Sequence, residues 1–184
     1  MEEERLVRNC APTLAGLKTG SIFTCPYHSR EQLLESIRTL NLKFAKKGLR
    51  LLPLRFSKSK ALVYLYRPGK LRQDLSQDSA ASLLRCHGYD PERCEHCVKQ
   101  LACKLRSQED FPHEIGLFLG YPVEDVKGFI QKGPDCCKLT GCWKVYGDAE
   151  SASRKFAQYK KCTQIYCQQH ARGAKLERLT VATQ

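Results

Sequence analysis

Residues 111–122, FPHEIGLFLGYP, form the longest apolar run of the chain and carry a His-Glu pair between two prolines. Pro112 suits the first position of a helix, Gly120 can end a helix in the left-handed conformation, and Pro122 can begin the next one. The run therefore predicts a helix, a turn and a second helix that contribute to the hydrophobic core.

The composition around this run is that of an ordinary globular protein. The chain has 184 residues, of which 42% are hydrophobic and 27% charged, and a chain of this length usually forms one domain. It has no apolar run of about 18 residues that could cross a membrane, and the acidic start MEEERLVRN does not match a secretory signal. We therefore expect a single cytoplasmic domain over residues 1–184, without a membrane partner.

Two β-prone runs on the N-terminal side predict a hairpin over residues 49–67. The runs LRLLPLRF and ALVYLYR are joined by the polar residues SKSK, and Pro53 marks the first run as an edge strand. Residues 141–146 predict a further strand of the same sheet, and residues 21–25 can add another. Because strands and helices do not alternate regularly, we predict an α+β fold with a small, mostly antiparallel sheet covered by several helices.

Capping residues and apolar spacing predict two long helices. Ser29 and Gln32 form a capping box, and the apolar residues that follow recur at helical spacing up to Gly48. Asp148 can cap a second helix that runs toward the C-terminus, and residues 177–184 are expected to fray.

Cysteines are concentrated in residues 86–103, CHGYDPERCEHCVKQLAC. Because cytosolic thiols stay reduced, clustered cysteines bind metals, react, or pack as small hydrophobic residues. A helix that starts at the Asp-Pro pair 90–91 places Cys94 and Cys97 on one face, and thiolates at this spacing can hold Zn²⁺ or one iron of an iron–sulfur cluster.

We therefore predict a Cys-rich helical segment at about residues 86–105 with zinc or an iron–sulfur cluster as its candidate cofactor. The candidate metal ligands are Cys86, Cys94, Cys97 and Cys103. The alternative is that the same cysteines belong to a plain apolar helix stripe.

Cys10 and His113 are a candidate catalytic pair. A proline two residues after Cys10 predicts a helix start there, and the positive end of the helix dipole would lower the pKa of the thiol. His113 lies at another predicted helix start, where a neutral imidazole can accept a proton. Carboxylates that could orient this imidazole are those of Glu114, Asp125 and Asp148. The alternative is that Cys10 packs in the core and His113 makes a structural hydrogen bond.

The charge is basic and unevenly distributed. The chain has 31 basic and 19 acidic residues, a net charge of +12, and residues 1–60 carry 12 basic and 5 acidic residues, a net charge of +7. Such a region can attract nucleic acid, with residues 30–60 as the candidate surface, or an anionic cofactor or acidic protein. The sequence contains neither a P-loop motif nor G-x-G-x-x-G, so both of these phosphate-binding motifs are absent.

Five motifs together resemble the bacterial family catalogued as domain of unknown function 3793. In chain order they are CAPTLAGLK, LVYLYRPGKL, FPHEIGLFLGYPVEDVKGFI, WKVYGD and YKKC, and the likeness covers residues 6–179. The resemblance implies no reaction, but iron-economy or flavodoxin-type neighbours of its members favour a metal- or redox-linked role. The cysteine cluster departs from the family's usual pattern, so a metal there would be a feature of this member.

Three functions follow from these observations. The first is a metal- or redox-linked accessory protein that handles iron, zinc or thiols and has a redox or metal-handling protein as its partner. The second is a cysteine-nucleophile enzyme that uses Cys10 and His113. The third is a basic nucleic-acid-binding module. We rank them in this order, and the sequence leaves open whether the protein is an enzyme.

Overall fold

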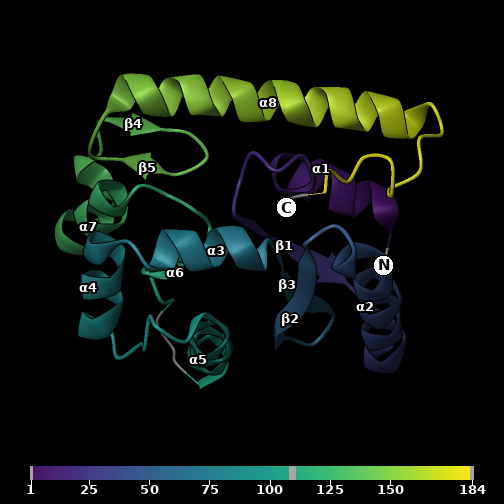
Figure 1. The fold of residues 1–184 in the computed structure, drawn as a ribbon, viewed down its shortest axis with the longest axis horizontal. Coiled ribbons are helices and arrows are strands. Elements are labelled where there is room, and N and C mark those ends of the chain that lie inside the picture. Colours follow the sequence, from purple (N-terminus) through teal and green to yellow (C-terminus); the bar gives the residue numbers. More distant parts are fainter. Residues whose placement is uncertain (1, 108–110, 183–184) are drawn as a thin grey trace. The chain divides into compact units, whose positions relative to one another are not determined.

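The computed structural model describes residues 2–107 and 111–182 (Figure 1). Helices dominate these residues, and they are accompanied by a three-stranded and a two-stranded antiparallel sheet. This is the predicted α+β class. In the described part of the chain, no helix is both long and apolar enough to cross a membrane.

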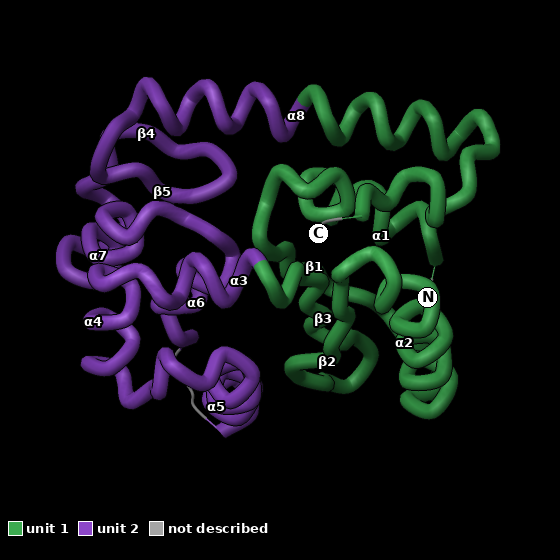
Figure 2. The backbone as a smooth tube through the Cα atoms, viewed as in Figure 1, with its two compact units in different colours: residues 1–69, 161–184 green, residues 70–160 purple. Residues whose placement is uncertain are grey.

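The chain divides into two compact units (Figure 2). Unit 1 comprises residues 1–69 and 161–184, and unit 2 comprises residues 70–160. Helix α8 (Ala149–Ala171) begins in unit 2 and continues into unit 1. That the whole chain forms one domain stays a prediction.

The sheet of unit 1 contains the predicted hairpin. Strands β1 (Gly20–Pro26), β2 (Arg50–Phe56) and β3 (Lys60–Tyr66) are antiparallel and lie in the order β1-β3-β2. β2 is therefore an edge strand, as Pro53 indicated, and the register shifts between Pro53 and Arg55. A proline has no N–H to give to the ladder, which explains why it is tolerated at the edge and beside this irregularity.

The prediction that residues 141–146 join this sheet was wrong. Strand β5 (Lys144–Val145) pairs only with β4 (Leu139–Thr140), and the two form a separate small sheet in unit 2. A tight turn brings these strands together, and closing such a short loop costs little chain entropy. Local pairing therefore replaces the long-range pairing that strand propensity suggested.

Two helices of unit 1 contribute to a core with the sheet. Side chains of α1 (Glu3–Leu14) and α2 (Arg30–Ala45) share one buried cluster with residues of all three strands. The predicted cap of α2 is present, since the N–H of Gln32 donates to Ser29 Oγ at 3.3 Å.

The C-terminal segment is part of the same core, so the predicted fraying was wrong for the described residues up to 182. Leu176 and Leu179 are buried in the core cluster of unit 1. Glu177 pairs with Lys43 of α2 at 2.7 Å, and the N–H of Val181 donates to the carbonyl of Leu14 at 3.0 Å. Two leucines three positions apart therefore anchor this otherwise polar segment in the core. The polar composition of the segment did not indicate this packing.

Unit 2 is mainly helical. Its helices before α8 are α3 (Pro68–Leu75), which begins at the boundary with unit 1, α4 (Asp78–Cys86), α5 (Cys94–Ser107), α6 (Ile115–Phe118), α7 (Val123–Lys132) and the 3-10 helix η1 (Pro134–Cys136). The predicted helix, turn and helix of residues 111–122 are α6, a turn at Gly120 with a φ of +72°, and the start of α7 after Pro122. Leu117 and Phe118 of this run are buried, so it does contribute to the core.

Candidate functional site

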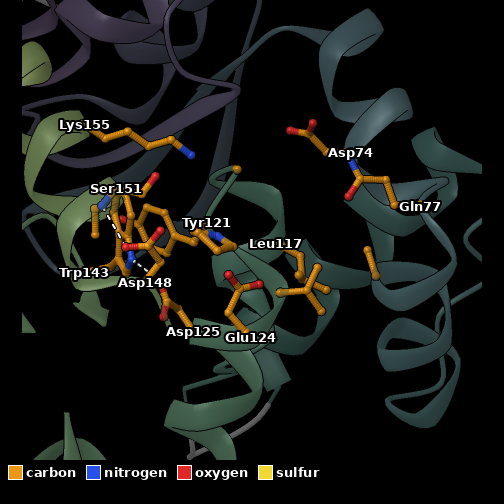
Figure 3. Close-up of a pocket in the computed structure, with 15 residues that line it drawn as sticks. Asp74, Gln77, Leu117, Tyr121, Glu124, Asp125, Trp143, Asp148, Ser151 and Lys155 are labelled. Carbon is orange, nitrogen blue, oxygen red and sulfur yellow. Dashed lines mark hydrogen bonds between the residues drawn. The ribbon is translucent and has the colours of Figure 1, made fainter. Parts of the chain in front are cut away.

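Unit 2 contains a cavity of about 350 Å³ (Figure 3). Its walls come from α3, α4, the turn between α6 and α7, the segment after β4, and the start of α8. The polar side chains of the lining, apart from the buried Asp125, are Asp74, Gln77, Tyr121, Glu124, Trp143, Asp148, Ser151 and Lys155. The cavity is therefore assembled from parts of the chain that are far apart in sequence.

Asp125 of α7 holds one wall of the cavity in place. The residue is 3% exposed, and its carboxylate accepts hydrogen bonds from Trp143 Nε1 at 2.7 Å and from the backbone N–H groups of Tyr146 at 2.7 Å and Gly147 at 2.8 Å. Three donors compensate a buried carboxylate well. Asp125 therefore fixes the segment around β5 against α7, and its charge is largely committed to these bonds.

Aromatic rings form this wall. Trp143 stacks on Tyr121 with ring centroids 4.8 Å apart, and Phe156 of α8 meets the indole edge-on at 4.5 Å. The hydroxyl of Tyr121 donates to the carbonyl of Cys142 at 3.2 Å. Burial raises the pKa of Tyr121, so the side chain stays a neutral phenol. The wall is therefore an apolar surface whose hydrogen-bonding groups, the Tyr121 hydroxyl and the Trp143 indole N–H, are uncharged.

Acidic side chains reach the cavity from three separate elements. They are Asp74 of α3, Glu124 in the first turn of α7, and Asp148, which caps α8 by accepting from the N–H of Ser151 at 3.0 Å. Gly147 makes room for Glu124, because a Cβ at this glycine would lie 2.5 Å from Glu124 Cγ.

Lys155 is the one basic side chain in the described lining of the cavity. It lies one helical turn after Ser151, and Figure 3 shows its ammonium and the carboxylates of Asp74 and Glu124 directed toward one space. Within the described residues, Lys155 makes no ion pair. The lining is therefore net negative, in a protein whose net charge is +12.

Glu114, a candidate for orienting His113, is bound to other groups. Its buried carboxylate accepts from the hydroxyl of Tyr89 and from Lys104 Nζ of α5, each at 3.0 Å. Lys104 also lies over the ring of Tyr89, 4.2 Å from its centroid. Burial alone would raise the pKa of Glu114, but the hydrogen bonds from Lys104 and Tyr89 outweigh burial and hold the pKa below its ordinary value. These contacts indicate a structural role.

His113 is exposed just before α6. Its ring packs edge-on against Phe129, with centroids 4.8 Å apart. It also lines a second, mostly apolar cavity of about 390 Å³, together with Phe111 and Ile115 among others. The imidazole is thus accessible, as a catalytic base would need to be.

Cys10 is not at a helix start, so this part of the prediction was wrong. The helix α1 begins at Glu3 and includes Pro12, which places Cys10 in its interior. The thiol is 0% exposed in the core of unit 1, and burial raises its pKa well above the ordinary value despite an opposing effect of Lys18. A thiol without any exposed surface cannot reach a substrate, so Cys10 is poorly placed to act as a nucleophile. Cys10 belongs to unit 1 and His113 to unit 2, and their catalytic pairing stays a prediction.

The structure brings together two of the four predicted metal ligands. Cys94 and Cys97 are buried at the start of α5, whereas Cys86 and Cys103 are exposed. Among residues 2–107 and 111–182, no group of three or more His, Cys, Asp or Glu side chains is placed to hold a metal ion. The four-cysteine metal site stays a prediction.

The family described as protein of unknown function, DUF3793, has a model that matches residues 6–180. The chain belongs to this family. No curated protein and no solved structure matches the chain. The cavity of unit 2 lies entirely within the part of the chain that the family model covers, although membership of DUF3793 assigns no activity.

No sequence motif marks Trp143, Tyr121 and Lys155 as parts of one site. Two of the acids, Asp125 and Asp148, were noted as possible partners of His113. A useful signal was the single tryptophan beside a polar turn, because a buried indole N–H needs an acceptor. Asp125 is that acceptor.

Proposed function

We propose that the protein is an accessory protein that binds a small organic cation in the cavity of unit 2. The observation that carries this proposal is the approach of Asp74, Glu124 and Asp148 to one cavity from three elements, against the single ammonium of Lys155. Oriented carboxylates around a concave surface favour a positively charged ligand.

The aromatic wall suggests a ligand with an apolar body. Trp143 and Tyr121 offer ring surface, and a cation near such rings gains from their quadrupoles as well as from the carboxylates. The volume of about 350 Å³ lies in the range of small-molecule sites, which is about 300–1,000 Å³. A protonated amine on an aromatic or aliphatic group fits these features.

The test uses the fluorescence of Trp143, which is the only tryptophan of the chain and lines the cavity. Benzylamine, a cation at neutral pH, is titrated into the full-length protein in parallel with benzyl alcohol, its neutral analogue. We expect saturable binding of the amine, weakened about tenfold by Glu124→Gln, which corresponds to about 1.4 kcal/mol. The matched control is Glu150→Gln, because Glu150 is an exposed acid of the first turn of α8 that pairs with Arg154.

A second variant tests whether positive charge in the lining opposes the binding of a cation. Lys155→Gln removes the positive charge from the lining and should tighten binding of benzylamine, because a ligand cation no longer meets a like charge. Equal binding of the alcohol and the amine, or an unchanged affinity in Glu124→Gln, would contradict the proposal.

We further propose that the accessory function is linked to metal or redox chemistry. Support for it comes from Cys94 and Cys97, which lie one turn apart on one face of α5. Metal analysis of protein purified without oxygen tests the metal, which should be present and should be lost when Cys94 and Cys97 are both replaced with serine.

Nucleic-acid binding is a second candidate, favoured by the distribution of charge between the units. Unit 1 carries 17 basic and 6 acidic residues, a net charge of +11, whereas unit 2 carries 14 and 13, a net charge of +1. Nearly all of the excess positive charge thus belongs to unit 1, which also contains the candidate surface of residues 30–60. Affinity for single-stranded RNA should then fall steeply with salt concentration, and an affinity independent of salt would contradict this function.

A further inference from the structure

Cys94 and Cys97 are neighbours at the start of α5. Cys94 is the first helical residue, and the carbonyl of Arg93 accepts from the N–H groups of His96 at 2.8 Å and Cys97 at 3.0 Å. Side chains three positions apart on a helix have Cβ atoms about 5–6 Å apart. Both thiols are buried, since Cys94 is 7% exposed and Cys97 is 0% exposed.

This arrangement needs only a small adjustment to form a disulfide. The Cβ atoms of a disulfide lie about 3.5–4.5 Å apart, so the pair must approach by about 1–2 Å. Cys94 can move at low cost because the N–H of a first helical residue has no acceptor within its own helix. No helical hydrogen bond from this N–H has to break.

We propose that Cys94 and Cys97 are a redox-active dithiol that exchanges with a small-molecule disulfide of the glutathione type. The thiolate of Cys94 attacks one sulfur of this disulfide, the S–S bond breaks, and one glutathione thiolate leaves. Cys97 then loses its proton and attacks the Cys94 sulfur of the mixed disulfide, which releases the second thiolate. The two thiolates take up the two protons, so the protein pair is oxidised by two electrons and the glutathione disulfide is reduced to two thiols.

The surroundings determine the order of these steps. The thiol of Cys97 donates to the carbonyl of Asp90 at 2.9 Å, which holds this side chain in place. Cys94, the more accessible thiol, reacts first. Burial limits the access of a disulfide to both sulfur atoms, so the pair exchanges slowly.

Trypsin provides a direct assay of this pair. It cleaves after Arg93 and Lys99, so the peptide of residues 94–99, CEHCVK, contains both thiols and no other cysteine. Native full-length protein is equilibrated with mixtures of reduced and oxidised glutathione at about pH 8.5, where slow exchange is faster, then blocked with N-ethylmaleimide and digested. By mass spectrometry, we expect the peptide to change from doubly blocked to an internal disulfide as the mixture becomes oxidising.

Two variants and a denatured sample complete the test. Cys97→Ser should leave Cys94 as a mixed disulfide with glutathione, whereas Cys103→Ser removes an exposed thiol of the same helix and should not change the titration. The native protein should form the internal disulfide at a lower proportion of oxidised glutathione than protein in denaturant. A wild-type peptide that stays doubly blocked in oxidised glutathione, or that carries glutathione without an internal disulfide, would overturn the proposal. The state of the wild-type peptide can be read whether or not Cys97→Ser folds and whether or not the cavity of unit 2 binds a cation.

Discussion

Arg67 is a buried cation that joins three segments of unit 1. Arg67 is 1% exposed, and its guanidinium donates to the carbonyls of Thr13 and Leu14, each at 2.7 Å, of Val181 at 2.8 Å and of Lys47 at 3.3 Å. Thr13 and Leu14 are the last residues of α1, so their carbonyls have no N–H donor in a further turn of the helix. Arg67 donates to these carbonyls and places a positive charge at the negative end of the helix dipole.

Replacing Arg67 should therefore destabilise unit 1 strongly. Arg67→Met keeps the apolar stem but removes every donor, and we expect a loss of about 3–5 kcal/mol in the free energy of unfolding, since buried unpaired polar groups cost about 1–3 kcal/mol each. Urea unfolding followed by circular dichroism measures this loss. Arg38→Met is the control, because Arg38 is exposed and its ion pair with Glu35 is worth less than about 1 kcal/mol. Equal losses in the two variants would show that the buried hydrogen bonds of Arg67 contribute little.

Glu114 links the start of α6 to Lys104 of α5 and to Tyr89, which lies between α4 and α5. These contacts hold the pKa of Glu114 below its ordinary value of 4.5. A lowered pKa in the folded protein contributes stability above the ordinary pKa, and this contribution is lost as the pH falls through the folded-state pKa. Acid should therefore weaken the attachment of α6 to α5.

The prediction is a smaller acid sensitivity in Glu114→Gln. The free energy of unfolding, followed through Trp143, should fall less in this variant than in the wild type as the pH drops from about 5 to about 3. Glu92→Gln, which removes an exposed carboxylate near Arg85, should keep the wild-type slope. If Glu114→Gln also keeps that slope, the contacts of Glu114 do not provide the pH-dependent stability assigned to them.

Elements with strong local signals were predictable from the sequence. Three residues were assigned correctly because each acts on backbone groups close to it in the sequence. They are Pro53 in the edge strand β2, Ser29 at the cap of α2 and Asp148 at the cap of α8. The start of α1 was misplaced because Pro12 was taken to mark a helix start, whereas the helix begins earlier, at Glu3, and continues through the proline.

The candidate site was much less predictable, because its residues meet only through the fold of the molecule. Asp74, Trp143 and Lys155 lie in different elements of unit 2 and have no shared motif. The cysteine motif, in contrast, was visible in the sequence, but the sequence did not show that only Cys94 and Cys97 would be buried together. Spacing along a helix predicts such a pair, whereas a cavity depends on tertiary packing.

The two units carry very different net charges, and each proposed role belongs to one of them: cation binding to unit 2 and nucleic-acid binding to unit 1. Unit 2 is close to neutral at +1 and contains the acidic cavity, whereas unit 1 has a net charge of +11. A small cation is therefore expected to bind by the local carboxylates of unit 2, against the overall positive charge of the protein. Binding should persist at moderate salt, because screening weakens the long-range repulsion as well as the local attraction.

The most direct test of the cation site is a calorimetric titration of the full-length protein with benzylamine, compared with benzyl alcohol under the same conditions. We expect a saturable heat with about one benzylamine per chain, a far weaker heat with the alcohol, and an association constant lowered about tenfold in Glu124→Gln. Indistinguishable titrations of the amine and the alcohol, or the absence of a saturable heat with the amine, would contradict the assignment of the cavity as a site for organic cations.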